Sequence, residues 1–287
     1  MVATTQQKNL SQKTDSYPFT DKNFNTLRDI VGERTGISLS EHKRDLVYGR
    51  LTRRLRILSM KSFDEYCDLL LNNPGDEMEH FTNAITTNLT SFFREQHHFD
   101  FLSDELLPDL LQRNGHKGLR IWSAGCSTGE EPYSIAMTLR ESIPNIDNYD
   151  IRILATDLDT NVVKHASSGV YSASRVEGMS KERLKRWFLK GKGEKAEYVK
   201  VSSELRNMIA FQQLNLMNAW PMRGKFDIIF CRNVVIYFDK PTQSVLFDRF
   251  ANQMQGSSHL IIGHSENLNN VTDRFSLIGK TIYGRAG

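Results

Sequence analysis

Two spacings of apolar residues divide the chain into an N-terminal part and a larger C-terminal part. Up to residue 86 the apolar positions recur every three or four residues, the spacing that puts them on one face of an α-helix. We therefore predict a helical domain over residues 20–86, preceded by a polar, disordered tail over residues 1–19. The apolar stripes are Phe24, Leu27, Ile30 and Val31; Val47, Leu51, Leu55 and Leu58; Phe63, Tyr66, Leu69 and Leu70; and Met78, Phe81 and Ile85.

From Leu119 onward, short apolar runs alternate with helical stretches, a rhythm typical of a parallel α/β sheet. The expected strands are Leu119–Ser123, Ile151–Thr156, Phe226–Cys231 and His259–Gly263, and the expected helices are Glu131–Arg140, Asn161–Ala166 and Thr242–Gln253. A linker and a connecting helix are expected over 87–117, and a doubly wound sheet over 118–287.

Two segments interrupt this alternation. Alternating apolar residues after a pair of glycines predict a small antiparallel β insertion at about 190–212. The apolar residues of 275–283 predict a further strand that pairs with 259–263.

The composition fits a globular protein and excludes several classes of function. Of 287 residues, 39% are hydrophobic and 25% charged, and no apolar run approaches the roughly 18 residues that cross a bilayer. Three widely separated cysteines with no CxxC pair predict neither disulfides nor a metal site. The net charge of +3 is too small to indicate nucleic-acid binding. We expect a cytoplasmic monomer that neither binds nucleic acid nor inserts into membranes.

The first expected strand ends in a glycine turn that opens a helix, the arrangement that holds nucleotide-like cofactors at the carboxyl edge of a parallel sheet. Gly125 and Gly129 provide the turn, and Glu130, Glu131 and Pro132 begin the helix. The two carboxylates repel a pyrophosphate, and the proline removes one of the N–H groups that would bind it. The carboxylates suit a cofactor with a nucleoside and a positive charge, such as S-adenosylmethionine. Acids at a helix start also stabilise its dipole, so this motif alone leaves both explanations open.

Asp157 and Asp159 follow the second expected strand. A carboxylate in this place accepts hydrogen bonds from both hydroxyls of a ribose. An N-cap of the next helix is the structural alternative, and Asp159 serves it at least as well. Asp157 is then left without a structural task, which favours a cofactor contact.

Polar residues surround two phenylalanines at the junction of the expected domains. Asn88, Thr90 and Arg94 are residues that a clamp over a cofactor would use, and Arg94 can bind a carboxylate through two hydrogen bonds. The alternative is a linker in which Ser91 caps the following helix and the phenylalanines fill the core. The residues alone do not decide between the two.

Arg232, Asn233 and Tyr237 follow the most apolar strand, which we expect at the centre of the sheet. Its carboxyl end then faces the cofactor crevice. The structural alternatives are a surface cation, a turn residue and a half-buried aromatic residue, respectively.

Five motifs in order resemble the CheR-type chemotaxis receptor methyltransferases, over about residues 20–283. They are T-N-L-T-S-F-F-R-E (87–95), S-A-G-C-S-T-G-E-E-P-Y-S-I-A-M (123–137), A-T-D-L-D (155–159), F-C-R-N-V-V-I-Y-F (230–238) and G-H-S-E-N (263–267). The resemblance implies an α/β fold: a class I S-adenosylmethionine-dependent methyltransferase sheet with an all-helical N-terminal domain and a small antiparallel β-subdomain.

The resemblance also implies the reaction and the site. The product is the methyl ester of a glutamate side chain on cytoplasmic helices of chemoreceptors, and S-adenosyl-L-homocysteine is released. A glutamate is ionised at pH 7, so no general base is required. We expect Arg94, Arg232 and Tyr237 to act in catalysis. The implied cofactor contacts are Asn88, Thr90, Arg94, Glu131, Asp157, Asn215, Leu216, Arg232 and Asn233.

Basic residues concentrate between residues 41 and 61, where seven Lys or Arg oppose two acids. Lys43, Arg50, Arg53 and Arg54 fall on about one face of the expected helix and are predicted to dock the acidic receptor helices. A solvated charged face is the plainer explanation. The β insertion is a candidate site for a receptor's C-terminal peptide. A non-catalytic receptor adaptor that binds the cofactor and a nucleotide-dependent oxidoreductase are the competing functions.

Overall fold

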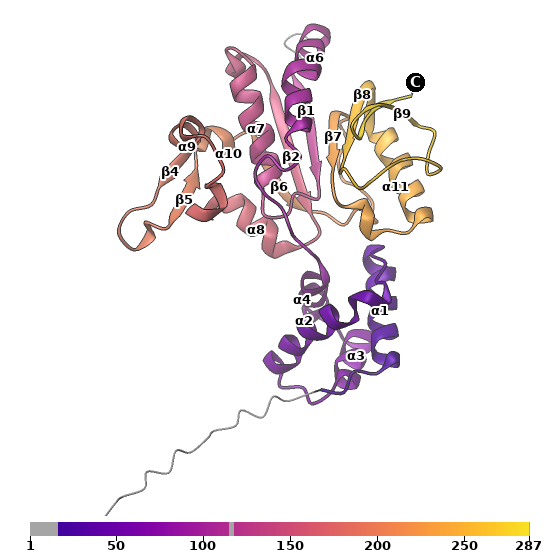
Figure 1. Cartoon of the computed structure of the whole chain (residues 1–287). Coiled ribbons are helices and arrows are strands. Elements are labelled where there is room, and N and C mark those ends of the chain that lie inside the picture. Colours follow the sequence, from indigo (N-terminus) through magenta and orange to yellow (C-terminus); the bar gives the residue numbers. More distant parts are fainter. Residues whose placement is uncertain (1–16, 115–117, 287) are drawn as a thin grey trace, which may run out of the picture.

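The computed structural model describes residues 17–114 and 118–286. Its N-terminal part is a helical domain that lies below the sheet in Figure 1. The predicted tail lies outside the described residues up to residue 16, but its last residues belong to the helical domain, because Phe19 packs on Phe63 with ring centroids 4.4 Å apart. The helices of this domain are α1 (Asp21–Thr35), η1 (Glu41–Lys43), α2 (Arg44–Ile57), α3 (Phe63–Asn72) and α4 (Glu77–Ile85).

One hydrophobic core holds the helical domain together. The predicted apolar stripes supply nearly all of its buried residues, including Leu27, Leu51 and Phe81. Local capping fixes where the helices begin: the Thr20 hydroxyl accepts from the Asn23 amide at the start of α1, and Ser62 does the same for Glu65 at α3. The periodicity of the sequence therefore predicts this domain correctly.

The second part is a seven-stranded sheet with strand order β6-β2-β1-β7-β8-β10-β9. Neighbours from β6 to β8 run parallel, and the C-terminal hairpin of β9 and β10 adds antiparallel to β8. The strands are β1 (Leu119–Ala124), β2 (Ile151–Asp157), β6 (Ile209–Gln213), β7 (Phe226–Cys231), β8 (Met254–Ile262), β9 (Phe275–Gly279) and β10 (Ile282–Arg285).

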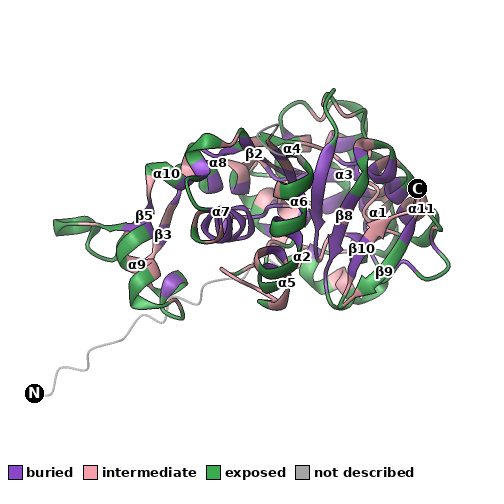
Figure 2. Ribbon diagram, turned by 90° about the horizontal axis from the view of Figure 1, so that it is seen from above, coloured by how far each residue is buried: buried purple, intermediate pink, exposed green. Residues whose placement is uncertain are grey.

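Alternate residues of the central strands enter two different cores, as a doubly wound sheet requires. Ile121 of β1 belongs to one core, and Trp122 belongs to the other. Figure 2 shows these strands as buried ribbons between helices. The helices around the sheet are α5 (His97–Phe101), η2 (Leu102–Leu106), α6 (Leu107–Asn114), α7 (Glu130–Ser142), η4 (Ile146–Asn148), α8 (Thr160–Ser168), η7 (Val235–Tyr237) and α11 (Lys240–Gln253).

The small antiparallel sheet differs from the predicted insertion at 190–212. Its strands are β3 (Val170–Ser172), β4 (Phe188–Lys190) and β5 (Tyr198–Val201), in the order β3-β5-β4. Ile209–Gln213, expected inside the insertion, is instead the edge strand β6 and pairs in parallel with β2. As an edge strand it carries exposed glutamines, so it lacks the continuous apolar run from which the other parallel strands were predicted. The short helices here are η5 (Ala173–Val176), α9 (Lys181–Trp187), η6 (Gly193–Lys195) and α10 (Ser203–Arg206).

Several hydrogen bonds join the helical domain to the carboxyl edge of the sheet. The Ser38 amide donates to the Tyr237 carbonyl at 2.8 Å, beside an isolated bridge between Ile37 and Phe238. Farther along, the Thr86 hydroxyl donates to Asp159 at 2.8 Å. None of the helices in the described part of the chain combines the length and the apolarity that crossing a membrane requires.

Candidate active site

A cavity of about 330 Å³ lies where the helical domain meets the carboxyl ends of β1, β2 and β7. Loops of the sheet form one side of it, and the helical domain contributes residues such as Ile37 and Lys43 to the other. Every cofactor contact implied by the resemblance lines this cavity, as does Tyr237. The structure thus brings together residues from five segments that are far apart in the sequence.

The glycine turn is needed for packing within the protein. Gly125 has a φ of 106° and Gly129 a φ of 98°, both in the region that favours glycine. A Cβ on Gly125 would lie 2.3 Å from a methyl group of Val234, and one on Gly129 would lie 2.8 Å from Ala166. These glycines bring β1, α8 and the loop after β7 close together and so shape the cavity.

The two acids that begin α7 point to different partners. Glu130 forms an ion pair with Arg175 in η5 and so ties α7 to the small sheet. Glu131 lines the cavity instead: its Oε1 accepts from the Ser123 hydroxyl at 2.7 Å and its Oε2 from Arg232 at 2.9 Å. Burial raises the pKa of Glu131 above its usual value, against the pull of the Arg232 charge. Of the two, only Glu131 is placed to meet a ligand.

Arg232 is buried and paired rather than open to a substrate. Its side chain is 2% exposed and lies between Glu131 and Glu95, 3.3 Å from the latter. It also donates to the Arg94 carbonyl. Both terminal nitrogens of the guanidinium are therefore engaged by these neighbours, and the expectation that Arg232 itself orients a substrate carboxylate is not favoured by this geometry.

Asp157 has the structural task that the sequence did not reveal. Its carboxylate accepts from the amides of Ser127 at 2.7 Å and Asp159 at 3.0 Å, which fixes the glycine loop against the end of β2. Burial raises its pKa to about 6, despite these hydrogen bonds. Asp159 caps α8 as expected, accepting from the Asn161 amide at 2.9 Å. Asp157 lines the cavity as well, so it serves the fold and faces the ligand space.

The segment after α4 combines both roles that its residues allowed. Phe92 and Phe93 pack against the core on one side of the sheet. The Asn88 amide donates to Asp159 at 2.8 Å, and Arg94 reaches back to the Leu89 carbonyl at 2.7 Å; both line the cavity with Thr90. Ser91 does not cap the next helix, because α5 begins only at His97.

Asn215, Leu216 and Tyr237 line the cavity as well. The Asn215 amide donates to the carbonyl of Arg34 at the end of α1, at 2.7 Å. Leu216 is buried, and Tyr237 lies with its ring 4.8 Å from the Lys43 ammonium. Burial raises the pKa of Tyr237, so its hydroxyl stays protonated at neutral pH.

Two acids that the sequence analysis did not single out, Glu95 and Glu266, bind residues that line the cavity and so fix their positions. Glu95 accepts from the His264 ring at 2.7 Å and from its amide at 3.1 Å, in addition to its ion pair with Arg232. Burial acts to raise the pKa of Glu95, but His264 and Arg232 outweigh it and lower the value to about 2. Glu266 accepts from the amides of Gly263 at 2.6 Å and Asn233 at 2.9 Å. Both residues lie in motifs quoted for the resemblance.

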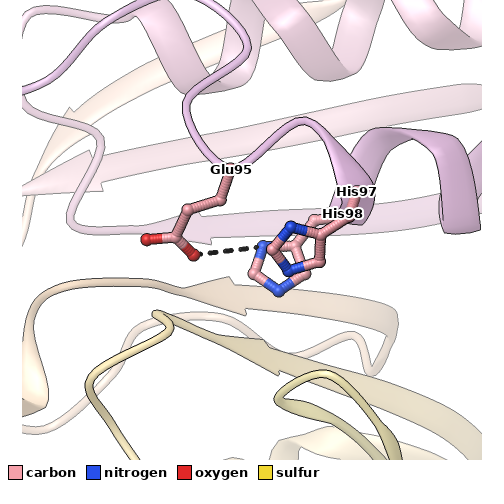
Figure 3. A group of neighbouring side chains, drawn as sticks. All are labelled: Glu95, His97 and His98. Carbon is pink, nitrogen blue, oxygen red and sulfur yellow. Dashed lines mark ion pairs between the residues drawn. The ribbon is translucent and has the colours of Figure 1, made fainter.

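Glu95 also lies near two histidines, as Figure 3 shows. Potential ligand atoms of Glu95, His97 and His98 are within 4.8 Å of one another. Both oxygens of Glu95 already accept hydrogen bonds or face Arg232, and the His98 Nε2 lies 3.1 Å from the Lys280 carbonyl. Burial and the Arg232 charge lower the pKa of His98 to about 4. A second cation here would meet Arg232, so we assign no metal to this group.

The predicted docking face of α2 is divided by the structure. Arg54 forms a two-pronged ion pair with buried Glu77, and Arg50 donates to the carbonyls of Ala84 and Ile85 at the end of α4. Lys43 lines the cavity, and Arg53 is exposed. The four residues therefore do not form one free basic stripe.

The helical domain, the doubly wound sheet and the acid-lined cavity at its carboxyl edge agree with the S-adenosylmethionine-dependent methyltransferase that the family models identify. The family model for the CheR methyltransferase SAM-binding domain matches residues 88–284, and that for the CheR all-alpha domain matches residues 22–86. The chain belongs to the CheR methyltransferase family.

Several curated relatives are similar over nearly their whole length. Chemotaxis protein methyltransferase 2 of Pseudomonas aeruginosa is 47% identical over 94% of this chain and 95% of its own. The probable chemotaxis protein methyltransferase of Rhizobium etli is 45% identical over 88% and 96%. The chemotaxis protein methyltransferase of Escherichia coli is 42% identical over 96% and 94%.

Proposed function

We propose that this chain transfers the methyl group of S-adenosylmethionine to glutamate side chains on the cytoplasmic helices of chemoreceptors. The observation that carries the proposal is the cavity at the carboxyl edge of the sheet, whose lining combines the buried carboxylates of Glu131 and Asp157 with the part-buried cations Lys43 and Arg94. Such a site suits a cationic cofactor and an anionic acceptor together.

Residues of the sheet loops would hold the cofactor. Asp157 at the end of β2 is placed for the ribose hydroxyls, and Glu131 for the positively charged amino-acid part. Asn215 and Leu216, which follow β6, also line the cavity and are proposed as cofactor contacts. Asn88, Thr90, Arg94 and Asn233 complete the lining on the remaining sides.

The reaction asks the protein for alignment rather than for proton transfer. S-adenosylmethionine supplies a methyl group on a sulfonium leaving group, and the acceptor carboxylate is ionised at neutral pH. The residues around the cavity bind, orient and exclude water. Arg94 and Tyr237, at the cavity wall, are the proposed groups nearest the acceptor, whereas Arg232 positions Glu131 from behind.

Two surfaces outside the cavity are proposed to dock the receptor. Arg53 remains available on the surface of α2 for an acidic receptor helix. In the small sheet, β4 is an edge strand with exposed Leu189, and a receptor's C-terminal peptide would add to such an edge. We place the protein in the cytoplasm, as a monomer, where it meets the receptor's signalling helices.

A labelling assay tests the proposal. The protein is incubated with chemoreceptor-containing membranes and S-adenosylmethionine labelled in its methyl group. We expect label on the receptor that mild base releases, because carboxyl methyl esters hydrolyse there. Receptor and cofactor binding without transfer would favour the adaptor function. Calorimetric binding of NAD in place of S-adenosylhomocysteine would favour an oxidoreductase.

A further inference from the structure

The cavity is lined by three cations, and their surroundings differ sharply. Arg232 is buried between Glu131 and Glu95, so its charge is already balanced. Arg94 donates to the Leu89 carbonyl. Lys43 has no ion pair with any carboxylate in the described part of the chain; its ammonium lies instead 4.8 Å from the centre of the Tyr237 ring. Arg94 also has no ion pair but uses one N–H group on the Leu89 carbonyl, whereas the Lys43 ammonium makes no side-chain hydrogen bond within the described residues, so Lys43 has the most capacity left for an anion.

Lys43 is also held in a setting that makes an incoming anion more favourable than on an open surface. The residue is half-buried at the end of η1, and burial together with the nearby Arg50 charge lowers its pKa. The charge has lost hydration without gaining a carboxylate partner, and Coulomb attraction is stronger in such a partly desolvated place. A carboxylate reaching this point would restore what the ammonium lacks.

The position of Lys43 relative to the cavity is fixed by backbone contacts. The Ser38 amide donates to the Tyr237 carbonyl, and Ile37 bridges to Phe238, so the segment that leads to η1 is attached to the loop after β7. Lys43 thus joins the cavity lining from the helical domain, whereas Glu131 begins α7 and Asp157 ends β2. A cation–π interaction with the Tyr237 ring also stabilises the Lys43 ammonium in this position.

We propose that Lys43 is a catalytic residue that binds the carboxylate of the target glutamate and directs one of its oxygens toward the transferable methyl group; this inference rests on the proposed function. A lone pair of that oxygen forms the new C–O bond, and the electron pair of the breaking C–S bond stays on sulfur. No proton moves, and Lys43 remains an ammonium throughout. The helical domain then supplies part of the catalytic machinery and is more than a docking module.

A carboxylate at Lys43 has two possible sources, the target glutamate and the amino-acid end of the cofactor. We commit to the glutamate, because Lys43 belongs to the helical domain and lies over Tyr237, whereas the acids proposed for the cofactor, Glu131 and Asp157, belong to the sheet domain. The two sources predict different effects on cofactor affinity, which can be measured without any receptor.

The test uses the full chain with Lys43→Met, Lys43→Arg and a control, Arg56→Met. Arg56 is an exposed cation of α2 outside the cavity, so its loss matches the change in net charge. Methylation of chemoreceptor membranes gives kcat and KM, and calorimetry gives the Kd for S-adenosylhomocysteine. We expect Lys43→Met to lower kcat about 10- to 100-fold, the scale of one charged hydrogen bond, with an unchanged Kd. Lys43→Arg should recover part of the loss, and Arg56→Met should match the wild type.

Each other outcome overturns the inference. A kcat within twofold of the wild type removes Lys43 from catalysis, and a rise in KM alone makes it a docking residue. A Kd that rises in step with the loss of kcat assigns the bound carboxylate to the cofactor. An unlabelled receptor with the wild-type protein refutes the proposed function itself, and the inference with it.

Discussion

The two walls of the cavity are built on different principles. On the sheet side, Glu131, Asp157 and Arg232 are buried and each already holds partners within the protein. Lys43 of the helical domain and Tyr237, which lies beside it in the loop after β7, are instead half-buried and make few polar contacts through their side chains. Preorganised groups suit a cofactor that binds in one pose, whereas groups with spare capacity suit a side chain presented by another protein. We infer that the paired, buried charges bind the cofactor and that the unpaired cation binds the side chain of the receptor.

Removal of Arg232 should have the largest effect and breaks the sheet-side wall. Arg232→Met leaves Glu131 and Glu95 buried without their shared cation. Loss of one partner from a buried charge network costs about 3–5 kcal/mol of unfolding free energy. Urea unfolding of the variant should show this loss along with the loss of methyl transfer. A variant as stable as the wild type would mean that Arg232 is not a structural cation.

Two adjacent arginines of α2 give a matched pair within the helical domain. Arg54→Ala should cost a few kcal/mol, because Glu77 is then left buried with only Tyr66 as a partner. Arg53→Ala should change the unfolding free energy by less than about 0.5 kcal/mol, because Arg53 is exposed. Thermal unfolding of both variants checks this, and equal losses would contradict the division of the basic face.

Asp157 gives the pH dependence of cofactor affinity. Its pKa of about 6 means that the carboxylate becomes protonated as the pH falls through 6, and a protonated acid accepts hydrogen bonds from ribose hydroxyls poorly. The Kd for S-adenosylhomocysteine should therefore rise below pH 6, by up to about tenfold per pH unit. Calorimetry between pH 5 and pH 8 measures this, with Asp157→Asn as the control whose affinity is weak and flat.

The shifted pKa values of Asp157 and Glu95 change the stability of the folded protein with pH in opposite directions. Because the folded-state pKa of Asp157 is raised, this group favours the folded state at low pH and loses that contribution as the pH rises from about 4 to about 6. The pKa of Glu95 is lowered to about 2, so its contribution is present above pH 4 and is lost as the pH falls toward 2.

A small effect is expected for the loss of His264. Its ring is 66% exposed and donates to Glu95, so His264→Ala should cost no more than about 1 kcal/mol and change kcat little, because Arg232 still pairs with Glu95. A loss of activity as large as that of Lys43→Met would instead place His264 in the machinery of transfer.

Much of this organisation was predictable from local pattern. Apolar periodicity fixed the helical domain and the central strands, because their buried faces repeat at regular spacing. Most residues of the cavity came from motifs at strand ends or at the junction of the two domains, and Asn215 and Leu216 only from the family resemblance. Spacing alone does not distinguish Arg53 from Arg54, because the partner of Arg54 is Glu77, in a different helix. Asp157 and Arg232 likewise depend on partners brought near only by the fold.

In the proposed mechanism, residues of the sheet domain bind the cofactor, and Lys43 of the helical domain receives the acceptor glutamate. Calorimetry of S-adenosylhomocysteine with Asp157→Asn and Lys43→Met, side by side at pH 7.5, tests it most directly. We predict that Asp157→Asn weakens binding at least about tenfold, the scale of one lost charged hydrogen bond, while Lys43→Met binds as the wild type does. Equal weakening in both variants, or weakening in Lys43→Met alone, would contradict the account.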